Sequence, residues 1–295
     1  MGGGSWTTKS FANYVTDTRG VSADTFATMS YTAQDMYKAN HLSAVLNPMN
    51  VMRECCDSEE HPNTLPVILA LDVTGSMGDA SVKVAQKLNQ IMTDLYSDDG
   101  VKDIEFCIMG IGDVACDDSP VQMSQFESDI RIAEQLDQLY FEGGGGGNSY
   151  ESYSAAWYMG VNHCKLDCWN RGQKGIIITL GDELPNPYIP ASLGRHTQGH
   201  YLQGSVETSD LIEEAKEKYD LYHISVKDRS SSYDWNNSRY NLDKAWSELL
   251  GEDHYFIATL DNLANTIVNI VKNHATETIC GAGIQTTEDG NEVTW

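Results

Sequence analysis

The chain has 295 residues, 41% of them hydrophobic, and its 19 basic and 43 acidic residues give a formal net charge of −24. This balance argues against binding to the phosphate backbone of nucleic acids and against docking on anionic membranes, because both need clustered lysine and arginine. The length suits one large or two small domains.

The sequence contains no targeting or membrane signal that we can recognise. No apolar run approaches the roughly 18–20 residues of a membrane span, so we expect none. The first residues, Met1–Trp6, lack the basic and apolar regions of a secretory signal. Seven cysteines are an odd number spread through a long chain, which argues against a disulfide scaffold. We therefore expect a cytoplasmic protein.

Residues 1–63 are interpreted as an N-terminal arm whose helices pack on a main domain. Residues 1–23 are rich in Gly, Ser and Thr, and the pattern of residues 32–46 predicts a helix. Asn47 and Pro48 suit the start of a short second helix that continues to Met52. A tail that is disordered when alone is the alternative interpretation.

Residues 67–71 form a continuous apolar run, which predicts a strand buried on both faces. Asp72 ends this run, and Thr74 and Ser76 alternate with it, so an extended loop would point all three side chains the same way. Three converging oxygen ligands suit a hard divalent cation. Helix capping by Asp72 and Thr74 is the simpler alternative.

Strands and helices then alternate along the chain. We expect further strands at 104–111, 121–123, 175–180, 221–226 and 254–258, helices at 81–96, 129–140, 152–164, 206–219, 242–250 and 260–275, and a polar loop at 227–241. Residues 276–295 form a C-terminal tail whose Asp289-Gly290 could turn a hairpin.

This alternation predicts an α/β fold, a doubly wound and mainly parallel six-stranded sheet with helices on both faces. The expected strand order is 3-2-1-4-5-6, with the third strand antiparallel at the edge. Strands one and four would then be neighbours at the switch point, where ligands bind beyond the carboxyl ends of the strands. Asp72 and Asp182, which end these two strands, are therefore expected to converge.

The string Asp72-x-Thr74-x-Ser76 resembles the DxSxS/DxTxS signature of von Willebrand factor A (VWA) domains, which opens their metal-ion-dependent adhesion site, the MIDAS. The resemblance covers residues 64–275 in strand–helix order, and it points to the intracellular bacterial branch of the family. It implies a Rossmann-like domain in which Ser76 ligates the metal directly. The hydroxyl of Thr74 belongs to the same first loop, and Asp72 holds the ion through water.

The same resemblance implies ligands from two more loops. Family members place a Thr after a Gly-Gly pair in the second loop, whereas here the glycines 143–147 lead to Asn148. Asn148 is our choice for that ligand, with Ser149 as the second choice. Asp182 matches the acid of the third loop.

The family resemblance implies a non-catalytic module for metal-dependent protein–protein interaction. The ion would be Mg²⁺, with Mn²⁺ or Ca²⁺ as alternatives, and oxygen ligation would leave a coordination position for a carboxylate of a protein partner. A MoxR-type AAA+ ATPase, or another component of an intracellular multi-protein assembly, is the kind of partner that the family suggests. No nucleophile–base pair is visible, so we expect no enzyme.

The rival interpretation is an aspartyl-phosphate phosphotransferase or phosphatase of the haloacid-dehalogenase type, with Asp72 as the nucleophile. Three features argue against it. Val73 stands where that motif has Lys, Thr74 stands where many members have a second Asp, and the glycine run at 143–147 has no role there.

Other residues have two open interpretations. Zinc could use His163, Cys164 and Cys168, or the pair His196 and His200, although no CxxC or HExxH string is present. The glycine run could be a linker or a phosphate cradle. Three loop acids near the site are either outer ligands of the ion or solvated side chains: Asp113, Glu151 and Glu183. Three aromatic residues of the polar loop are either a partner surface or half-buried anchors: Tyr233, Trp235 and Tyr240.

Overall fold

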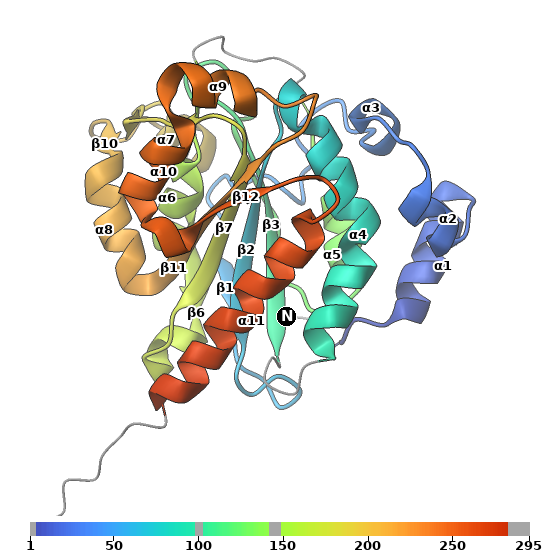
Figure 1. The fold of residues 1–295 in the computed structure, drawn as a ribbon. Coiled ribbons are helices and arrows are strands. Elements are labelled where there is room, and N and C mark those ends of the chain that lie inside the picture. Colours follow the sequence, from blue (N-terminus) through green and yellow to red (C-terminus); the bar gives the residue numbers. More distant parts are fainter. Residues whose placement is uncertain (1–3, 98–102, 142–148, 283–295) are drawn as a thin grey trace, which may run out of the picture.

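A six-stranded sheet forms the centre of the molecule (Figure 1). The structure is a computed structural model, and it describes residues 4–97, 103–141 and 149–282. The spatial order of the strands is β12-β11-β7-β2-β3-β4, and all neighbours are parallel except β3 and β4. Their bounds are β2 Leu65–Asp72, β3 Ile104–Ile111, β4 Val121–Met123, β7 Gly175–Gly181, β11 Tyr219–Val226 and β12 Tyr255–Ala258. The predicted α/β fold with a mostly parallel sheet is confirmed.

Both faces of the sheet are buried, because side chains alternate along each strand. In β2, Val67, Leu69 and Leu71 belong to one apolar core, and Ile68 and Ala70 belong to the other. Figure 1 shows the helices in two groups on either side of the sheet. The first core includes α4 Gly78–Tyr96, α5 Arg131–Leu136 and α11 Leu263–Ala282, and the second includes α6 Ser154–Asn162, α8 Thr208–Lys218 and α10 Leu242–Leu250.

Short helices and strands lie outside the central sheet and its six main helices. They are α7 Leu193–Thr197, α9 Tyr233–Tyr240, β1 Arg53–Cys55, β5 Tyr150–Glu151, β6 Cys164–Leu166, β8 Leu184–Pro185, β9 Tyr188–Ile189 and β10 Val206–Glu207, with 3-10 turns at Gly75–Met77, Asp167–Arg171 and Glu252–His254. β1 pairs with β6 in parallel, and β5 pairs with β8 in parallel.

The N-terminal segment packs on the first helical face. Its helices are α1 Thr8–Arg19, α2 Ala23–Thr28 and α3 Ala33–Met36, and their apolar side chains join the first core. The Gln86 side-chain amide, on α4, donates hydrogen bonds to the carbonyls of Phe26 at 2.8 Å and Met29 at 2.7 Å. Arg19 forms an ion pair with Asp137 at 2.6 Å. These contacts attach the segment to α4 and to the chain that follows α5.

Several predictions for this segment are wrong. The helix expected at 32–46 is only α3, which ends at Met36, and the helix expected to reach Met52 is replaced by a turn that leads into strand β1. The Ser- and Thr-rich start contains helix α1, which its composition does not predict. Thr7 caps it by accepting from the Ser10 amide, and Phe11 and Val15 face the core at i, i+4 spacing. Packing on α4 therefore outweighs a composition that favours loops.

The polar loop expected at 227–241 is also wrong, because residues Tyr233–Tyr240 form α9. The helix expected at 129–140 shortens to α5, and the helix expected at 260–275 continues to Ala282, so the tail begins inside α11. The hairpin predicted around Asp289-Gly290 lies outside the described residues.

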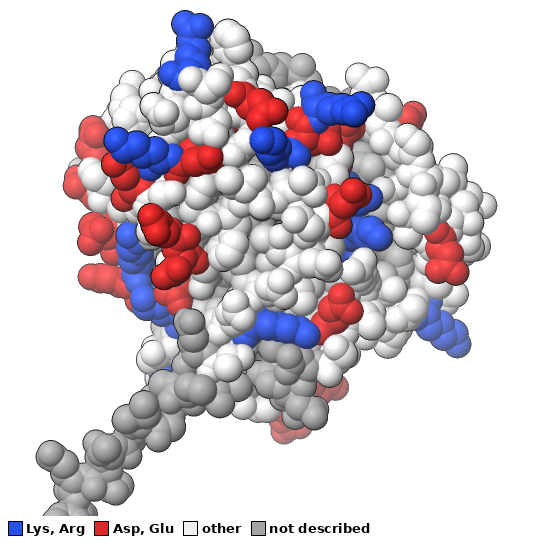
Figure 2. All heavy atoms as spheres, in the orientation of Figure 1, with Lys and Arg blue, Asp and Glu red and all other residues white. Residues whose placement is uncertain are grey.

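Acidic side chains dominate part of the surface. Figure 2 shows carboxylates gathered along the left edge of the molecule, over α8. Four exposed acids of this helix contribute to them: Asp210, Glu213, Glu214 and Glu217. Among the helices of the described segments, none is long and apolar enough to cross a membrane.

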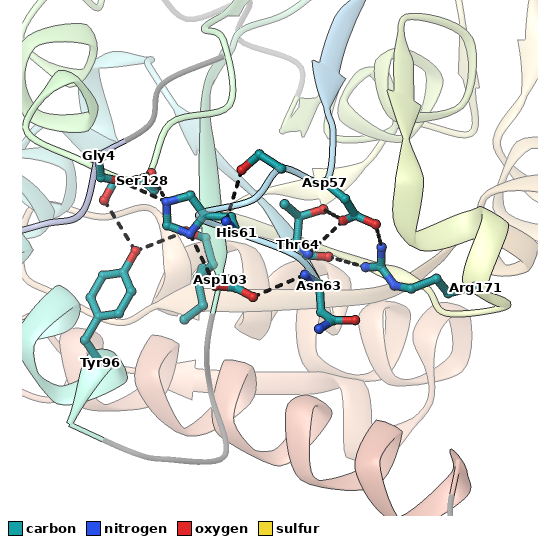
Figure 3. Close-up of polar contacts among 11 residues, drawn as sticks. Gly4, Asp57, His61, Asn63, Thr64, Tyr96, Asp103, Ser128 and Arg171 are labelled. Atoms are coloured by element: carbon teal, nitrogen blue, oxygen red, sulfur yellow. Dashed lines mark hydrogen bonds and ion pairs between the residues drawn. The ribbon is translucent and has the colours of Figure 1, made fainter.

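A polar network ties the N-terminal segment to the edge of the sheet where β2 and β3 begin (Figure 3). The His61 ring lies with Nδ1 3.3 Å from Asp103 Oδ1 and Nε2 3.1 Å from the Gly4 carbonyl oxygen. The Ser128 hydroxyl donates to the same carbonyl. Nearby, the Arg171 guanidinium donates to the Thr64 carbonyl at 2.8 Å. This network stabilises the edge of the sheet opposite to the predicted metal site.

Candidate metal centre

The first loop of the site begins where β2 ends. Asp72 is completely buried, and its Oδ1 accepts hydrogen bonds from the Thr74 amide at 2.8 Å and from the Thr74 hydroxyl at 2.5 Å. These bonds turn the chain sharply after the strand, and the short turn Gly75–Met77 then leads into α4. The Thr74 side chain is directed to Asp72 and does not cap α4.

The third loop lies beside the first because β7 is the parallel neighbour of β2. Leu71 is paired with Leu180, so Asp72 and Asp182 emerge at the same edge of the sheet. The Ser76 hydroxyl donates to Asp182 Oδ1 at 3.1 Å and thereby joins the two loops. The structure therefore brings together four of the predicted ligands: Asp72, Thr74, Ser76 and Asp182.

The second loop approaches the third through backbone pairing. β5 runs parallel to β8 with Tyr150 opposite Leu184, and the Ser149 carbonyl accepts from the Leu184 amide at 3.3 Å. Ser149 has a φ of 59°, a left-handed conformation. Asn148, our first choice for the second-loop ligand, lies outside the described residues, so its role stays a prediction.

Tyr153 is a residue of the site that the sequence did not indicate. Its ring is fully buried, and its hydroxyl donates to Asp72 Oδ2 at 2.8 Å. The Tyr153 hydroxyl oxygen in turn accepts a hydrogen bond from the Glu183 amide at 3.3 Å. A Cβ on Gly181 would lie only 1.8 Å from this hydroxyl oxygen, so only glycine fits there. The close approach explains why Gly181 precedes Asp182 in the third loop.

The start of helix α9 and the residue before it form hydrogen bonds with Asp182. The Ser232 amide donates to Asp182 Oδ2, and the Asn236 side chain donates to the Asp182 carbonyl oxygen at 2.9 Å. Both donors lie some fifty residues along the chain from Asp182, which is why no local pattern could have identified them. They orient the third-loop carboxylate toward Ser76.

Burial and mutual repulsion raise the pKa of these carboxyls. The pKa of Asp72 rises from its ordinary value of 3.8 to about 8, first because of burial and then because of the nearby Asp182 charge. Burial also raises the pKa of Asp182. Two further acids respond in the same way, Glu151 to about 11 and Glu183 to about 7, with burial as the main cause.

The remaining loop acids belong to this neighbourhood. Glu151 is only 2% exposed, and its Oε1 has no hydrogen-bond partner among the described residues. Asp113 is buried, accepts from the Ala115 amide at 2.9 Å, and adds to the field that raises the pKa of Glu151 and Glu183. These carboxyls therefore add to the negative charge around the buried pair of aspartates.

The donor set fits a divalent cation. In the described part of the chain, no Lys, Arg or His forms an ion pair with Asp72 or Asp182. The partners of these carboxylates are hydroxyls and amides, which compensate a buried charge incompletely. A cation would supply the missing charge, and the hydroxyls of Thr74 and Ser76 would supply neutral oxygens of the kind that Mg²⁺ accepts.

A zinc site is not found within the described ranges. No group of three or more His, Cys, Asp or Glu side chains that could hold a metal ion is found there. His163 Nδ1 lies 3.1 Å from the Val51 carbonyl oxygen, and Cys164 and Cys168 are buried thiols whose pKa is raised by burial. The two cysteines belong to the second core, whereas His163 is half-buried beside it.

The three aromatic residues of the expected loop differ from one another. Tyr233 is buried at the start of α9, whereas Trp235 is 59% exposed and Tyr240 is 40% exposed. The Arg239 guanidinium lies over both exposed rings, 5.3 and 5.6 Å from their centroids. The two exposed rings therefore present a surface patch on the helix that also holds Asp182.

No family model matches this sequence, and no curated protein matches it. Among solved structures, the chain is similar to the pilus adhesin SpaC of Lactobacillus rhamnosus GG in its open conformation, with 12% identity and a TM-score of 0.50. The match covers 78% of this chain and 31% of SpaC, so the chain spans about a third of that protein. At this identity the likeness shows a shared fold.

Two further structures match less closely. The vWF domain of the type V pili tip protein Mfa5 from Porphyromonas gingivalis has 13% identity and a TM-score of 0.45, covering 77% of this chain and 98% of that one. Proximal thread matrix protein 1 from the mussel byssus, with a zinc-occupied MIDAS motif, has 14% identity and a TM-score of 0.44, covering 72% and 46%.

Proposed function

We propose that residues 64–275 are a VWA-type domain that binds a divalent cation and uses it to hold a carboxylate of a protein partner. The observation that carries this proposal is the pair of fully buried carboxylates, Asp72 and Asp182, at the ends of neighbouring parallel strands. A buried pair of like charges is costly, and a cation bound between them removes that cost.

The residues have distinct roles in this proposal. Ser76 and Thr74 supply hydroxyl oxygens, Asp182 and Asp72 supply charge, and Asn148, with Ser149 as the second choice, completes the set from the second loop. Tyr153 and the Ser232 amide hold the outer carboxylate oxygens in place. The ion would be Mg²⁺, with Mn²⁺ and Ca²⁺ as alternatives.

The cellular setting is also a proposal. Family resemblance favours the cytoplasm and an assembly with a MoxR-type AAA+ ATPase, in which this chain acts as an adaptor. The partner would bring an acidic side chain to the coordination position that the protein ligands leave free. The 4–63 segment would act as an arm packed on the domain, as its contacts with α4 suggest.

The enzymatic alternative has less support from the geometry. A nucleophilic aspartate must reach the phosphorus of its substrate. Asp72 is completely buried, its Oδ1 accepts two hydrogen bonds from Thr74, and its Oδ2 accepts one from Tyr153. We therefore propose that Asp72 supports a bound ion and performs no covalent chemistry.

Titration of the full chain with Mg²⁺ and with Mn²⁺, measured by isothermal calorimetry, tests the proposal. We expect one ion per chain, and we expect the double variant Ser76→Ala with Asp182→Ala to bind none while its circular dichroism spectrum is retained. Glu213→Gln, an exposed acid on α8, is the matched control and should bind as the wild type does. Unchanged ion binding by the double variant would refute the proposal.

A further inference from the structure

The N-terminal segment builds one wall of a pocket that opens beside the metal centre. The pocket has a volume of about 470 Å³, within the range of specific ligand pockets. Thr74, Gly75 and Gly78 line it from the first loop and the start of α4, and Tyr37 and Lys38 line it from the chain that follows α3. A group in this pocket would therefore lie next to the loop that ligates the ion.

This wall is held rigidly against the domain. The Tyr37 hydroxyl donates to the Ser81 carbonyl at 2.8 Å, and its ring stacks on Phe141 with the centroids 4.5 Å apart. Gly78 permits the approach of α3, because a Cβ at this position would lie 2.8 Å from the Cβ of Ala33. The pocket is therefore pre-formed, which reduces the entropy lost when a ligand binds.

The pocket wall carries one positive charge, that of Lys38, which also interacts with the nearby carboxylate of Asp35 on α3. Among the described residues that line it, Lys38 is charged and none is acidic. Lys38 is exposed, and one of its three N–H donors is used by the Gln34 carbonyl at 3.0 Å. The ammonium can still receive an anion, although the chain as a whole carries a net charge of −24.

We propose that this pocket receives a second carboxylate of the partner, so that a short acidic segment binds with one carboxylate on the ion and another on Lys38. The inference rests on the proposed function of the metal centre. Because the rest of the chain is strongly acidic, a uniformly acidic partner would be repelled. The flanks of the bound segment are therefore neutral or basic.

Synthetic peptides test this inference on the full chain. The probes are fluorescently labelled peptides with two aspartates separated by glycine spacers of increasing length and flanked by lysines. A matched set carries asparagine in place of one aspartate. Fluorescence anisotropy in Mg²⁺ and in EDTA gives the affinities for the wild type, Lys38→Glu and the control Lys9→Glu, which makes the same charge change on the exposed surface of α1.

We expect Mg²⁺-dependent binding at a preferred spacing, weakened roughly tenfold by Lys38→Glu and unchanged by Lys9→Glu. The single-aspartate peptides should bind the wild type and Lys38→Glu equally, since their second contact is absent. Thermal unfolding should be the same for all three proteins, because both lysines are exposed.

Two results would overturn the inference while the proposed function stands. One is Mg²⁺-dependent peptide binding that Lys38→Glu leaves unchanged. The other is a chain that binds the ion by calorimetry and binds none of the peptides, which would assign the pocket to a different ligand. A chain that binds no ion at all would refute both the pocket inference and the metal proposal.

Discussion

Replacing Asp72 with Asn is expected to stabilise the ion-free protein and to abolish its response to divalent cations. Asp72 is buried beside Asp182, and its pKa is raised to about 8. Near neutral pH the unfolded chain carries an ionised Asp72, whereas the folded chain must protonate it or bury its charge. An amide of the same shape avoids this cost.

The size of the effect follows from the two pKa values. With 3.8 in the unfolded chain and about 8 in the folded chain, the carboxyl lowers the free energy of unfolding by roughly 4 kcal/mol at pH 7. The amide weakens the hydrogen bond from Tyr153, which costs about 1–2 kcal/mol. The net gain is therefore about 2–3 kcal/mol, a rise of several degrees in Tm for a domain of this size.

Urea and thermal unfolding in EDTA and in Mg²⁺ measure both parts of the prediction. The wild type should gain about 2.7 kcal/mol at an ion concentration one hundred times the Kd, and Asp72→Asn should gain nothing. Glu213→Gln is the control for the loss of one negative charge, since its side chain is exposed on α8.

A variant Asp72→Asn that is less stable than the wild type in EDTA by more than about 1 kcal/mol would contradict this prediction. Such a result would mean that Asp72 contributes to folding through its hydrogen bonds alone. Equal stabilisation of the variant and the wild type by Mg²⁺ would also contradict it, because the ion would then bind without Asp72.

Three more predictions follow from the site and the fold. The folded-state pKa values of Asp72 and Glu183 are raised, the latter to about 7, so the Tm of the ion-free protein should fall as pH rises from about 4 to 8. Saturating Mg²⁺ should flatten this dependence of Tm on pH. Calorimetry in buffers of different ionisation enthalpy should show that ion binding releases protons. Gly181→Ala should displace Tyr153, lower the free energy of unfolding by roughly 2 kcal/mol and weaken ion binding, whereas unchanged unfolding would mean that the ring moves freely. His61→Ala should lower the free energy of unfolding by roughly 2 kcal/mol and speed amide exchange in α1 without changing ion affinity, and an altered ion affinity would contradict the separation of the two edges of the sheet.

Elements with a strong local signal were predictable. β3 and β4 have the predicted bounds of 104–111 and 121–123, and α10 has the predicted bounds of 242–250. β3 is apolar except for Glu105 and Gly110, and its eight residues are all buried. Helices whose apolar face is short were not predictable, because α1 and α9 depend on contacts with α4 and with Asp182.

The residues of the candidate site also include some that the sequence could place and some that it could not. Asp72 and Asp182 could be placed together from sequence because each follows a buried strand, and parallel strands end at one edge of a sheet. Tyr153 and Ser232 could not be placed, since no spacing in the sequence relates either residue to the carboxylate that it contacts.

The sequence by itself determined a sheet of buried strands and the acids and hydroxyls at their carboxyl ends, because apolar runs and the residues that end them are local properties. Only the tertiary structure decided how those carboxylates are held. The Tyr153 hydroxyl reaches Asp72 across 81 residues of chain, and the pocket wall around Tyr37 reaches Ser81 across 44. Contacts over such separations depend on the packing of the whole domain, and no local pattern in the chain encodes them.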